Sequence, residues 1–210
     1  YITADNYDQN RNFFLSHFFR DNYDQWCSKL PLVSSGINIT RVEVWVTNKR
    51  GNFNESRNIV AFADLGENSH LCNSHWSTGG GDVNPSNNSN NELAEIKNNY
   101  PDARDISQTS SALKPLEAYG IEGGKDYEKI EQARLLSSSE YSVNSSLGYI
   151  TLSSALNPDE VLAVAFQYTY RGKTYQVGEF SADIDNTSNS LYVKMLKGTT
   201  TSPQLPIWHL

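Results

Sequence analysis

The sequence is poor in several residue types, and each shortage narrows the possible functions. The 210 residues include two cysteines, one methionine and four histidines. Two cysteines cannot build a multi-disulfide scaffold or a four-thiolate zinc site. The longest unbroken apolar run, residues 161–166, is far shorter than the roughly 20 residues of a transmembrane helix. Residues 1–10 lack the basic and apolar regions of a secretory signal peptide.

Basic charge is also scarce, whereas aromatic residues are abundant. The chain has 17 Lys and Arg against 24 Asp and Glu, a formal net charge of −7. Because nucleic-acid binding needs clustered Lys and Arg, we expect no nucleic-acid partner. Phe, Trp and Tyr make up 11% of the residues. That aromatic content is typical of a chain with a folded core.

Alternating hydrophobic patterns predict strands near both ends of the chain. Residues 37–47 (INITRVEVWVT) alternate and are β-branched, with Val44 and Val46 on one face and Trp45 on the other. Further strands are predicted over residues 58–65, 149–152 and 191–196. The clearest hairpin joins residues 160–170 to residues 174–184, and Gly172 in its turn supplies the positive φ.

Two segments predict helices. Residues 8–28 form the first, in which Phe14 and Phe18 are spaced to form one aromatic face. Residues 126–138 form the second, with Asp126 as its N-cap. The sequence therefore predicts an α+β domain. We expect an antiparallel, sandwich-like sheet, the N-terminal aromatic helix packed on it, and a second helix near residues 126–138.

The predicted domain spans residues 1–197 and contains a long polar insert at residues 66–125. The run GGGDVNPSNNSNN within it offers little apolar area, so we expect a mobile surface loop. Residues 69–125 are accordingly predicted to be dispensable for folding. The chain begins without Met and ends on apolar residues, so we interpret residues 198–210 as a linker to the next part of a longer parent chain.

The candidate metal ligands and cysteines form no familiar motif. His70, Cys72 and His75 lie within six residues, and Cys27 is a fourth potential ligand, but the spacing matches no common zinc signature. We therefore expect no metal ion and no cofactor. A disulfide between Cys27 and Cys72 is the other interpretation, and it requires an oxidising compartment.

No catalytic residues are predicted. Asp64 and Glu67 would suit glycoside chemistry only if they flanked a cleft at a defined separation, and acids at a strand end are usually solvated or capping. The chain contains no Gly-x-Ser-x-Gly motif. We therefore expect a protein that is not an enzyme.

Aromatic residues on the predicted strands are the remaining functional candidates. Trp45 lies opposite the valine face, and Tyr168, Tyr170 and Tyr175 lie close together in the predicted hairpin. If exposed, these rings form an interaction surface that could stack on sugars, as in a carbohydrate-binding module of a cell-surface protein. The alternative, which we favour, is that both faces of the sheet are covered, one by the Phe14/Phe18 helix and the other by part of a larger protein.

Several segments resemble the SprA/Sov family, the giant outer-membrane translocon of type IX secretion and gliding motility in Bacteroidota. They occur in the family's order and cover most of the chain outside residues 69–125. The segments are NFFLS (12–16), FFRDNY (18–23), LP (30–31), SGI (35–37), ITRVEVWVTN (39–48), RNIVAF (57–62), DLGE (64–67), LGYI (147–150), EVLAVA (160–165), YQVGEF (175–180) and PIW (206–208).

The resemblance implies a non-enzymatic conduit through which folded cargo with a C-terminal sorting signal leaves the cell. This chain is then an excised soluble domain of the translocon, associated with the outer membrane and exposed to the periplasm or the cell surface. The implied partners are the rest of the parent chain, lipoproteins or plug proteins of the secretion system, and secreted cargo. The family resemblance implies nothing for residues 70–75 or the Gly/Asn-rich loop.

Overall fold

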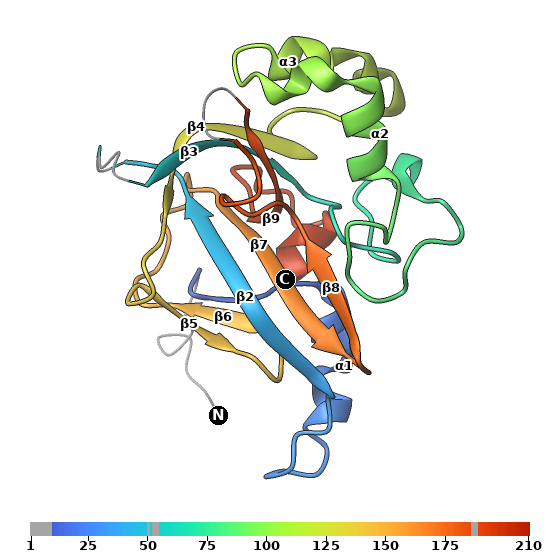
Figure 1. Cartoon of the computed structure of the whole chain (residues 1–210), viewed down its shortest axis with the longest axis vertical. Helices are drawn as coiled ribbons and strands as arrows, with labels where there is room; N and C mark the ends of the chain where they lie inside the picture. The colour runs from blue at the N-terminus through green and yellow to red at the C-terminus, as the bar shows by residue number, and fades with distance from the viewer. Residues whose placement is uncertain (1–9, 50, 52–54, 186–188) are drawn as a thin grey trace.

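The computed structural model describes residues 10–49, 51, 55–185 and 189–210, and within them the chain is an α+β domain with mostly antiparallel sheets (Figure 1). The strands are β1 (Asn12–Phe14), β2 (Ile37–Val46), β3 (Ser56–Phe62), β4 (Tyr127–Leu135), β5 (Tyr141–Asn144), β6 (Tyr149–Leu152), β7 (Leu162–Tyr170), β8 (Lys173–Val177) and β9 (Leu191–Lys197). The α-helices are α1 (His17–Trp26), α2 (Glu92–Asn99) and α3 (Thr109–Ala112). Short 3₁₀ helices are η2 (Ser74–Trp76), η3 (Pro101–Arg104), η4 (Lys114–Tyr119) and η5 (Pro206–His209).

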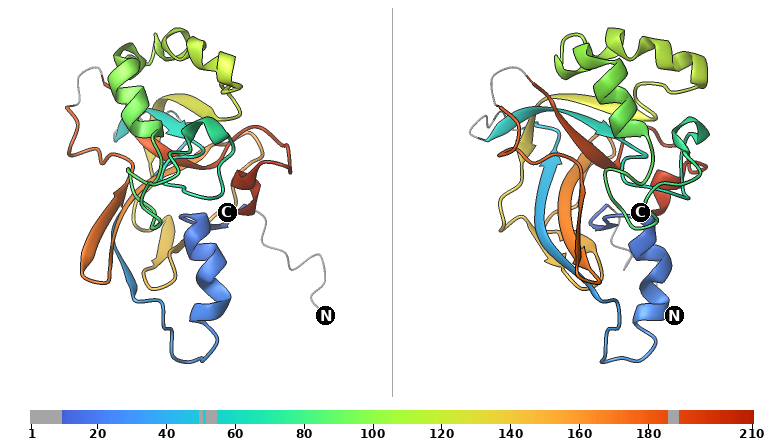
Figure 2. Two further views of the ribbon diagram at one scale, coloured as in Figure 1. Left: turned by 90° about the vertical axis from the view of Figure 1, so that its right-hand side faces the viewer. Right: turned by 45° about the vertical axis from the view of Figure 1, so that its right-hand side comes forward.

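The strands form two sheets. The larger has the order β2-β4-β3-β9-β7-β8, with an additional pairing of β2 and β7, and the smaller has the order β1-β6-β5. Within the larger sheet only β3 and β9 pair in parallel. The helices from α2 to η4 lie at one end of the molecule and α1 lies at the other (Figure 2).

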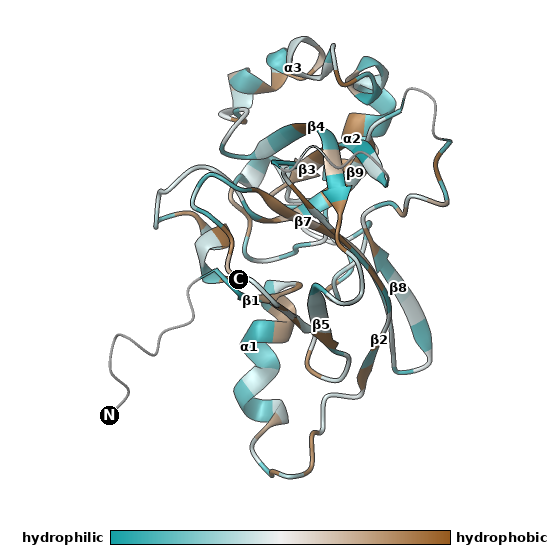
Figure 3. Cartoon of the chain, turned by 90° about the vertical axis from the view of Figure 1, so that its left-hand side faces the viewer, coloured by the Kyte–Doolittle hydropathy of each residue, from teal (hydrophilic) through white to brown (hydrophobic). Residues whose placement is uncertain are grey.

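Both faces of the larger sheet carry a cluster of buried residues. Val44 and Val46 of β2 belong to one core cluster, whereas Trp45 between them belongs to a second cluster on the opposite face. The central strands β2 and β7 carry mainly apolar residues (Figure 3). Small side chains are frequent in the second cluster: Ala61, Ala63, Ala133, Ala163 and Ala165. The predicted separation of Val44 and Val46 from Trp45 is confirmed.

Most of the strands predicted from alternation are confirmed. β2, β3, β6 and β9 match their predicted segments to within a few residues at each end. β7 and β8 form the predicted hairpin, although β8 ends at Val177 rather than continuing to residue 184. In the turn, Arg171 (φ 49°) and Gly172 (φ 75°) both adopt left-handed conformations, which suit the twist of a two-residue hairpin loop.

The first helix is shorter than the sequence predicts. Residues 8 and 9 lie outside the described residues, and Phe14 belongs to β1 rather than to a helix. The helix begins after Ser16, whose side chain accepts a hydrogen bond from the Phe18 backbone. The prediction of a helix over the whole of 8–28 is therefore wrong. A four-residue aromatic spacing cannot distinguish one helix from a strand followed by a helix.

The helix predicted over residues 126–138 is also wrong, because this segment forms β4. Ile130 and Ala133 face the second cluster although they are three residues apart. Their spacing results from an extra residue in β4, where Gln132 adopts φ 50° and donates its backbone N–H to Asn58 Oδ1 at 2.9 Å. A β-bulge between buried positions thus reproduces the spacing of a helical stripe.

The polar insert is anchored to the rest of the domain. Trp76, Leu93, Ile96 and Leu116 are all buried in the first core cluster together with residues of the sheet. Residues 92–119 form α2, η3, α3 and η4. Most of the larger apolar side chains of the insert are buried or partly buried, although Val83 and Tyr119 are exposed. Within the Gly/Asn-rich run that was expected to be a mobile loop, Ser86, Ser89 and Asn90 are buried.

Residues 198–210 also pack against the domain rather than leading away from it. Ile207 of η5 is buried in the second cluster, and Leu205 packs beside it. The Pro206 carbonyl accepts a hydrogen bond from His17 Nε2 at 2.8 Å. These contacts do not agree with the interpretation of this segment as a linker. No helix in the described parts of the chain is long and apolar enough to cross a membrane.

Candidate functional site

The predicted aromatic surface is only partly exposed. Trp45 and Tyr168 are 1% and 0% exposed, so neither can meet a ligand. Tyr170 and Tyr175 remain half-buried on the hairpin. The prediction of a shared surface of all four rings is wrong, because the chain's own side chains cover both faces of the sheet.

The tyrosines of the hairpin instead support a folded loop. Tyr168 donates its hydroxyl to the Pro85 carbonyl at 2.9 Å, and Tyr175 stacks on Tyr168 with ring centroids 5.3 Å apart. Asn87 donates its backbone N–H to Gln176 and accepts one from Gly178, both at 2.8 Å. Residues 81–89 are thus fixed against β8. An open polar groove of about 520 Å³ separates this loop from β8, and its lining includes Tyr175.

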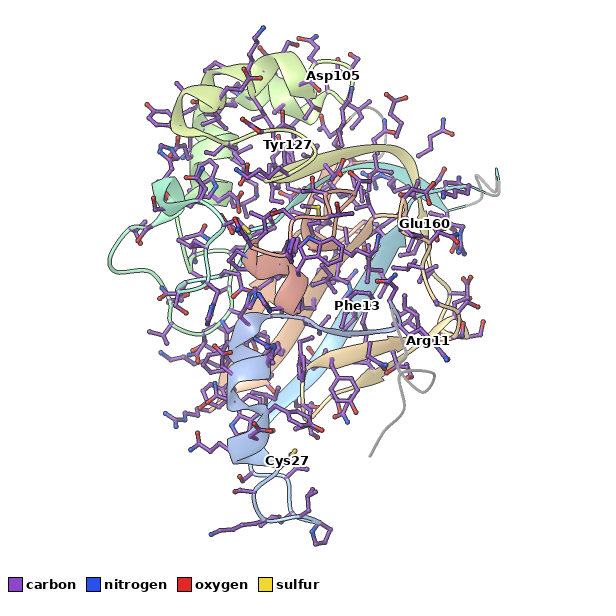
Figure 4. All side chains as sticks on the ribbon, turned by 180° about the vertical axis from the view of Figure 1, so that it is seen from behind. Arg11, Phe13, Cys27, Asp105, Tyr127 and Glu160 are labelled. Atoms are coloured by element: carbon purple, nitrogen blue, oxygen red, sulfur yellow. The ribbon has the colours of Figure 1, made fainter. Side chains whose placement is uncertain are left out.

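The two cysteines are free thiols, so the structure does not contain the predicted disulfide. Cys27 follows α1 at the end of the molecule away from η4 (Figure 4). Cys72 packs against the second core cluster. Burial, and next the Asp64 carboxylate, raise the pKa of the Cys72 thiol, which therefore stays protonated and unreactive.

The histidines considered as metal ligands pair separately with carboxylates. His70 Nε2 lies 2.7 Å from Asp21 Oδ2, and His75 Nε2 lies 3.0 Å from Glu95 Oε1. In the parts of the chain that the structure describes, no three His, Cys, Asp or Glu side chains are placed to hold a metal ion.

A cluster of buried ionisable groups surrounds Lys194, which we call the Lys194 cluster. Lys194 is 0% exposed, and its Nζ donates to the Leu65 carbonyl at 3.1 Å and lies 2.7 Å from Glu67 Oε1. The His17 backbone N–H donates to the same Glu67 oxygen at 3.2 Å. The cluster thus joins β9, α1 and the chain that follows β3.

Further buried carboxyls complete the Lys194 cluster. Asp64 accepts backbone N–H groups from Cys72 at 2.6 Å and Asn73 at 2.9 Å. Glu92 at the start of α2 and Asp126 before β4 are both buried, and each has one carboxyl oxygen without a hydrogen-bond partner. Because a buried carboxylate without a partner is costly, Glu92 favours the neutral form. The other oxygen of Asp126 accepts the Glu122 N–H at 2.9 Å and lies 3.7 Å from Lys125 Nζ.

The pKa values separate the carboxyls into two kinds. Burial raises the pKa of Asp64 to about 6, although the N–H groups of Cys72 and Asn73 act in the opposite direction. Burial, reinforced by Asp64, raises the pKa of Glu92 well above its usual range. Burial also acts to raise the pKa of Glu67, but Lys194 and His17 outweigh it and hold the value at about 2. Glu67 is therefore the ionised partner of Lys194.

The Lys194 cluster has a structural role. Glu67 and Lys194 are nearly inaccessible, and both oxygens of Asp64 are occupied by backbone donors. The sequence analysis singled out Asp64 and Glu67 but missed Lys194, Glu92 and the burial of Asp126. One signal was present, because Lys194 interrupts the apolar strand LYVKML, where a charge must find a buried partner.

A groove with a volume of about 630 Å³ lies between α1 and β1. It is lined by Asn12, Phe13, Phe14, Arg20, Asp21, Tyr23, Asp24 and Tyr149. A volume of this size, aromatic walls and a few charged side chains are typical of a ligand site. Sequence reasoning placed Phe14 in a helix and so missed this groove.

Comparison with models of known protein families and with curated proteins finds no match. Two features of the structure bear on function. One is the way in which the SprA/Sov-like segments assemble, and the other is the accessible groove between α1 and β1.

Proposed function

We propose that the chain is a non-enzymatic structural and interaction domain of an outer-membrane protein translocon of the SprA/Sov kind, acting in type IX secretion and gliding motility. One observation carries the proposal: segments that resemble that family, although distant in sequence, meet in space. Residues 39–48 contain most of β2, and they pair with β7 through residues 160–165. Residues 57–62 lie in β3, and residues 64–67 enter the Lys194 cluster.

The smaller matching segments are consistent with the same arrangement. Gly148 of LGYI packs beneath Phe19 of FFRDNY, and Phe19 in turn lies 5.2 Å from the Tyr168 ring on β7. These contacts support the sandwich-like packing of α1 and the smaller sheet on the larger sheet. The resemblance thus follows a three-dimensional core, as expected for a shared fold.

In this proposal the domain faces the periplasm or the cell surface and contacts its partners through loops. Large apolar side chains that remain exposed lie outside the strands of the larger sheet, among them Leu30, Leu32 and Tyr119. Such positions suit contacts with the rest of the parent translocon, with partner lipoproteins or plug proteins, or with secreted cargo.

A secretion assay tests the proposal. In a bacterium that encodes this chain, the chromosomal copy is changed to Gly148→Val, and export of a fluorescent reporter with a C-terminal sorting signal is measured. We expect reporter secretion and gliding to fall, with the parent protein still present in the outer-membrane fraction. Gly172→Ala, a substitution in an open turn, should leave both unchanged. Normal secretion by Gly148→Val cells would contradict the proposal, provided that the purified variant domain is unfolded.

A carbohydrate-binding module remains the second candidate function. It is favoured by the polar groove beside Tyr175, which is lined by Asp82, Ser86, Asn87, Asn88, Lys173, Thr174 and Gln176. Sugars bind through ring stacking together with amide and carboxylate hydrogen bonds. A glycan array separates the two candidates. Saturable binding that is lost in Tyr175→Ala and retained in Tyr119→Ala would favour the module.

A further inference from the structure

β1 is an edge strand whose outer side is unpaired. Its neighbour in the sheet is β6. The Leu152 N–H of β6 donates a hydrogen bond to the Arg11 carbonyl, next to β1, at 2.8 Å. The Leu15 N–H donates to the Gly148 carbonyl at 2.9 Å on the same side. Alternate residues of a strand direct their backbone groups to opposite sides, so those of Asn12 and Phe14 face away from β6.

These outward groups have no partner within the described residues. No backbone hydrogen bond outside the ladder with β6 involves the N–H or C=O of Asn12 or Phe14. The N–H and C=O groups of Asn12 and Phe14 therefore remain available, which makes two donors and two acceptors. Phe13 separates the two residues. An extended peptide repeats its own donors and acceptors at the same interval, about 6.8 Å, so it is complementary to this edge.

Three aromatic rings gather around β1, two of them from β1 and α1 and the third from β6 on the paired side. The Phe14 ring is 5.5 Å from that of Tyr23 on α1 and 5.7 Å from that of Tyr149 on β6, both in edge-to-face geometry. All three residues are only partly buried, and all three line the groove of about 630 Å³. The groove thus offers an apolar wall at the place where a side chain of an added strand would project.

The rim of the groove carries charges of both signs. Arg20 and Asp24 are exposed, and among the described residues neither side chain has a hydrogen-bond or ion-pair partner. Asp21, also at the rim, is engaged by His70. A rim with both signs can pair with the charged side chains of a peptide but has no strong overall preference for anionic or cationic ligands.

We propose that the groove between α1 and β1 binds an extended peptide segment, which adds as a strand to the edge of β1. Its backbone pairs with Asn12 and Phe14, and one apolar side chain packs against the rings of Phe14 and Tyr23, with Tyr149 behind Phe14. This inference goes beyond the proposed function and does not rest on it, because any parent protein could use the same groove.

A peptide fits these observations better than the other occupants. A sugar would use the rings but not the regular spacing of the backbone groups. A second copy would have to bring its own β1 together with the helix α1 that follows it, whereas a single extended segment needs only a backbone. A peptide uses both the edge and the rings.

The probe is a heptapeptide obtained by selecting a random peptide display library on the 210-residue chain and then synthesised with a fluorophore. Its binding is measured by fluorescence polarisation to wild type, Asn12→Ala and Asn12→Pro. Both substitutions remove the Asn12 Oδ1 contact with the Thr151 hydroxyl, which is 2.7 Å long. Only proline also removes the outward N–H, and proline is tolerated where an edge strand faces outwards.

We expect Asn12→Pro to weaken binding at least tenfold relative to Asn12→Ala, and Tyr23→Ala to weaken it by a similar factor. Hydrogen exchange at the Asn12 and Phe14 amides should slow when the peptide is bound. If Asn12→Pro does not fold, backbone N-methylation at alternate positions of the peptide supplies the same test, and one of the two methylation patterns should abolish binding.

Four outcomes would overturn the proposal. These are a library that yields no enriched peptide, equal affinities of Asn12→Pro and Asn12→Ala, unchanged exchange at both amides, and a dimer in solution that Asn12→Pro dissociates. None of these results bears on secretion, so failure here and failure of the proposed function are distinguishable.

Discussion

At the scale of single residues, the buried ammonium of Lys194 determines the charge state of its neighbours. It holds Glu67 ionised, while Glu92 and Asp126 each retain a buried oxygen without a hydrogen-bond partner. A group that is neutral when folded but ionised when unfolded makes stability depend on pH. The Lys194 cluster should therefore make the free energy of unfolding depend measurably on pH.

We expect the free energy of unfolding to be greatest near pH 4 and to fall on both sides. The raised pKa of Asp64, about 6, and that of Glu92 mean that the folded protein keeps protons that the unfolded chain releases, so stability falls as the pH rises from about 4 through 6. The pKa of Glu67 is lowered to about 2, so its contribution is lost as the pH falls from about 4.5 towards 2. Urea unfolding at a series of pH values measures both limbs.

Glu92→Gln is the matched variant, because a neutral amide removes the titration and retains the shape. It should flatten the decline between pH 5 and pH 8. A wild-type protein that is more stable at pH 8 than at pH 5 would contradict this account of the Lys194 cluster.

Gly148 is a second single residue on which the stability of the protein should depend. A Cβ there would lie 2.4 Å from Phe19 Cδ2, and φ is +71°. Gly172 has a similar φ, +75°, but nothing within 4 Å of the same position. We expect Gly172→Ala to cost about 1 kcal/mol from backbone strain alone, and Gly148→Ala to cost about 2–4 kcal/mol because overpacking is added. Thermal and urea unfolding of the two variants measure the difference, and equal losses would contradict the close contact of Gly148 with Phe19.

At the scale of elements, an ion-pair clamp connects the helices from α2 to η4 to the sheet. Arg104 of η3 contacts both oxygens of Glu179, at 2.5 and 2.6 Å, and lies over the Tyr192 ring. Lys97 of α2 lies 2.7 Å from Glu179 Oε1. Glu179 is nearly buried, so removal of its partners would leave a poorly solvated charge.

We expect Arg104→Ala to destabilise the protein by about 3 kcal/mol and to open residues 92–119 to limited proteolysis. Arg134→Ala is the control, because Arg134 also contacts both oxygens of one carboxylate, that of Glu140, which is more exposed. The control should cost at most about 1 kcal/mol. Similar losses from both substitutions, or cleavage unchanged in Arg104→Ala, would contradict the role of the clamp.

The elements also show where sequence reasoning succeeds. β2 is confirmed because its alternation is regular from Arg41 to Val46, beyond an irregularity between Ile39 and Arg41, and its two faces carry distinguishable residues, Val44 and Trp45. β4 was misassigned because the bulge at Gln132 changes the apparent period from two to three. The groove was missed because it depends on contacts of Phe14 with Tyr23 and Tyr149, and the pairing of β1 with β6 cannot be deduced from local pattern.

At the scale of the whole molecule, residues 69–125 supply part of the main core. The sequence predicts that they are dispensable, but Trp76 and Ile96 are fully buried in the first cluster. We now expect a chain in which residues 69–125 are replaced by a short Gly/Ser linker to lose cooperative unfolding, because several large side chains leave the core together. Circular dichroism and thermal melting check this result. A cooperative transition in the shortened chain would instead support the prediction, made from composition, that residues 69–125 are dispensable for folding.

The edge strands β1 and β8 differ in how far their outer backbone groups are paired, with a consequence for solubility. β8 ends the larger sheet, yet Asn87 occupies the backbone of Gln176 and Gly178 much as a neighbouring strand would. Unprotected edges promote aggregation by pairing with other chains. A loop that contributes little to the core thus shields β8 from intermolecular pairing. Loosening this loop should promote precipitation at high protein concentration, even where the melting temperature hardly changes.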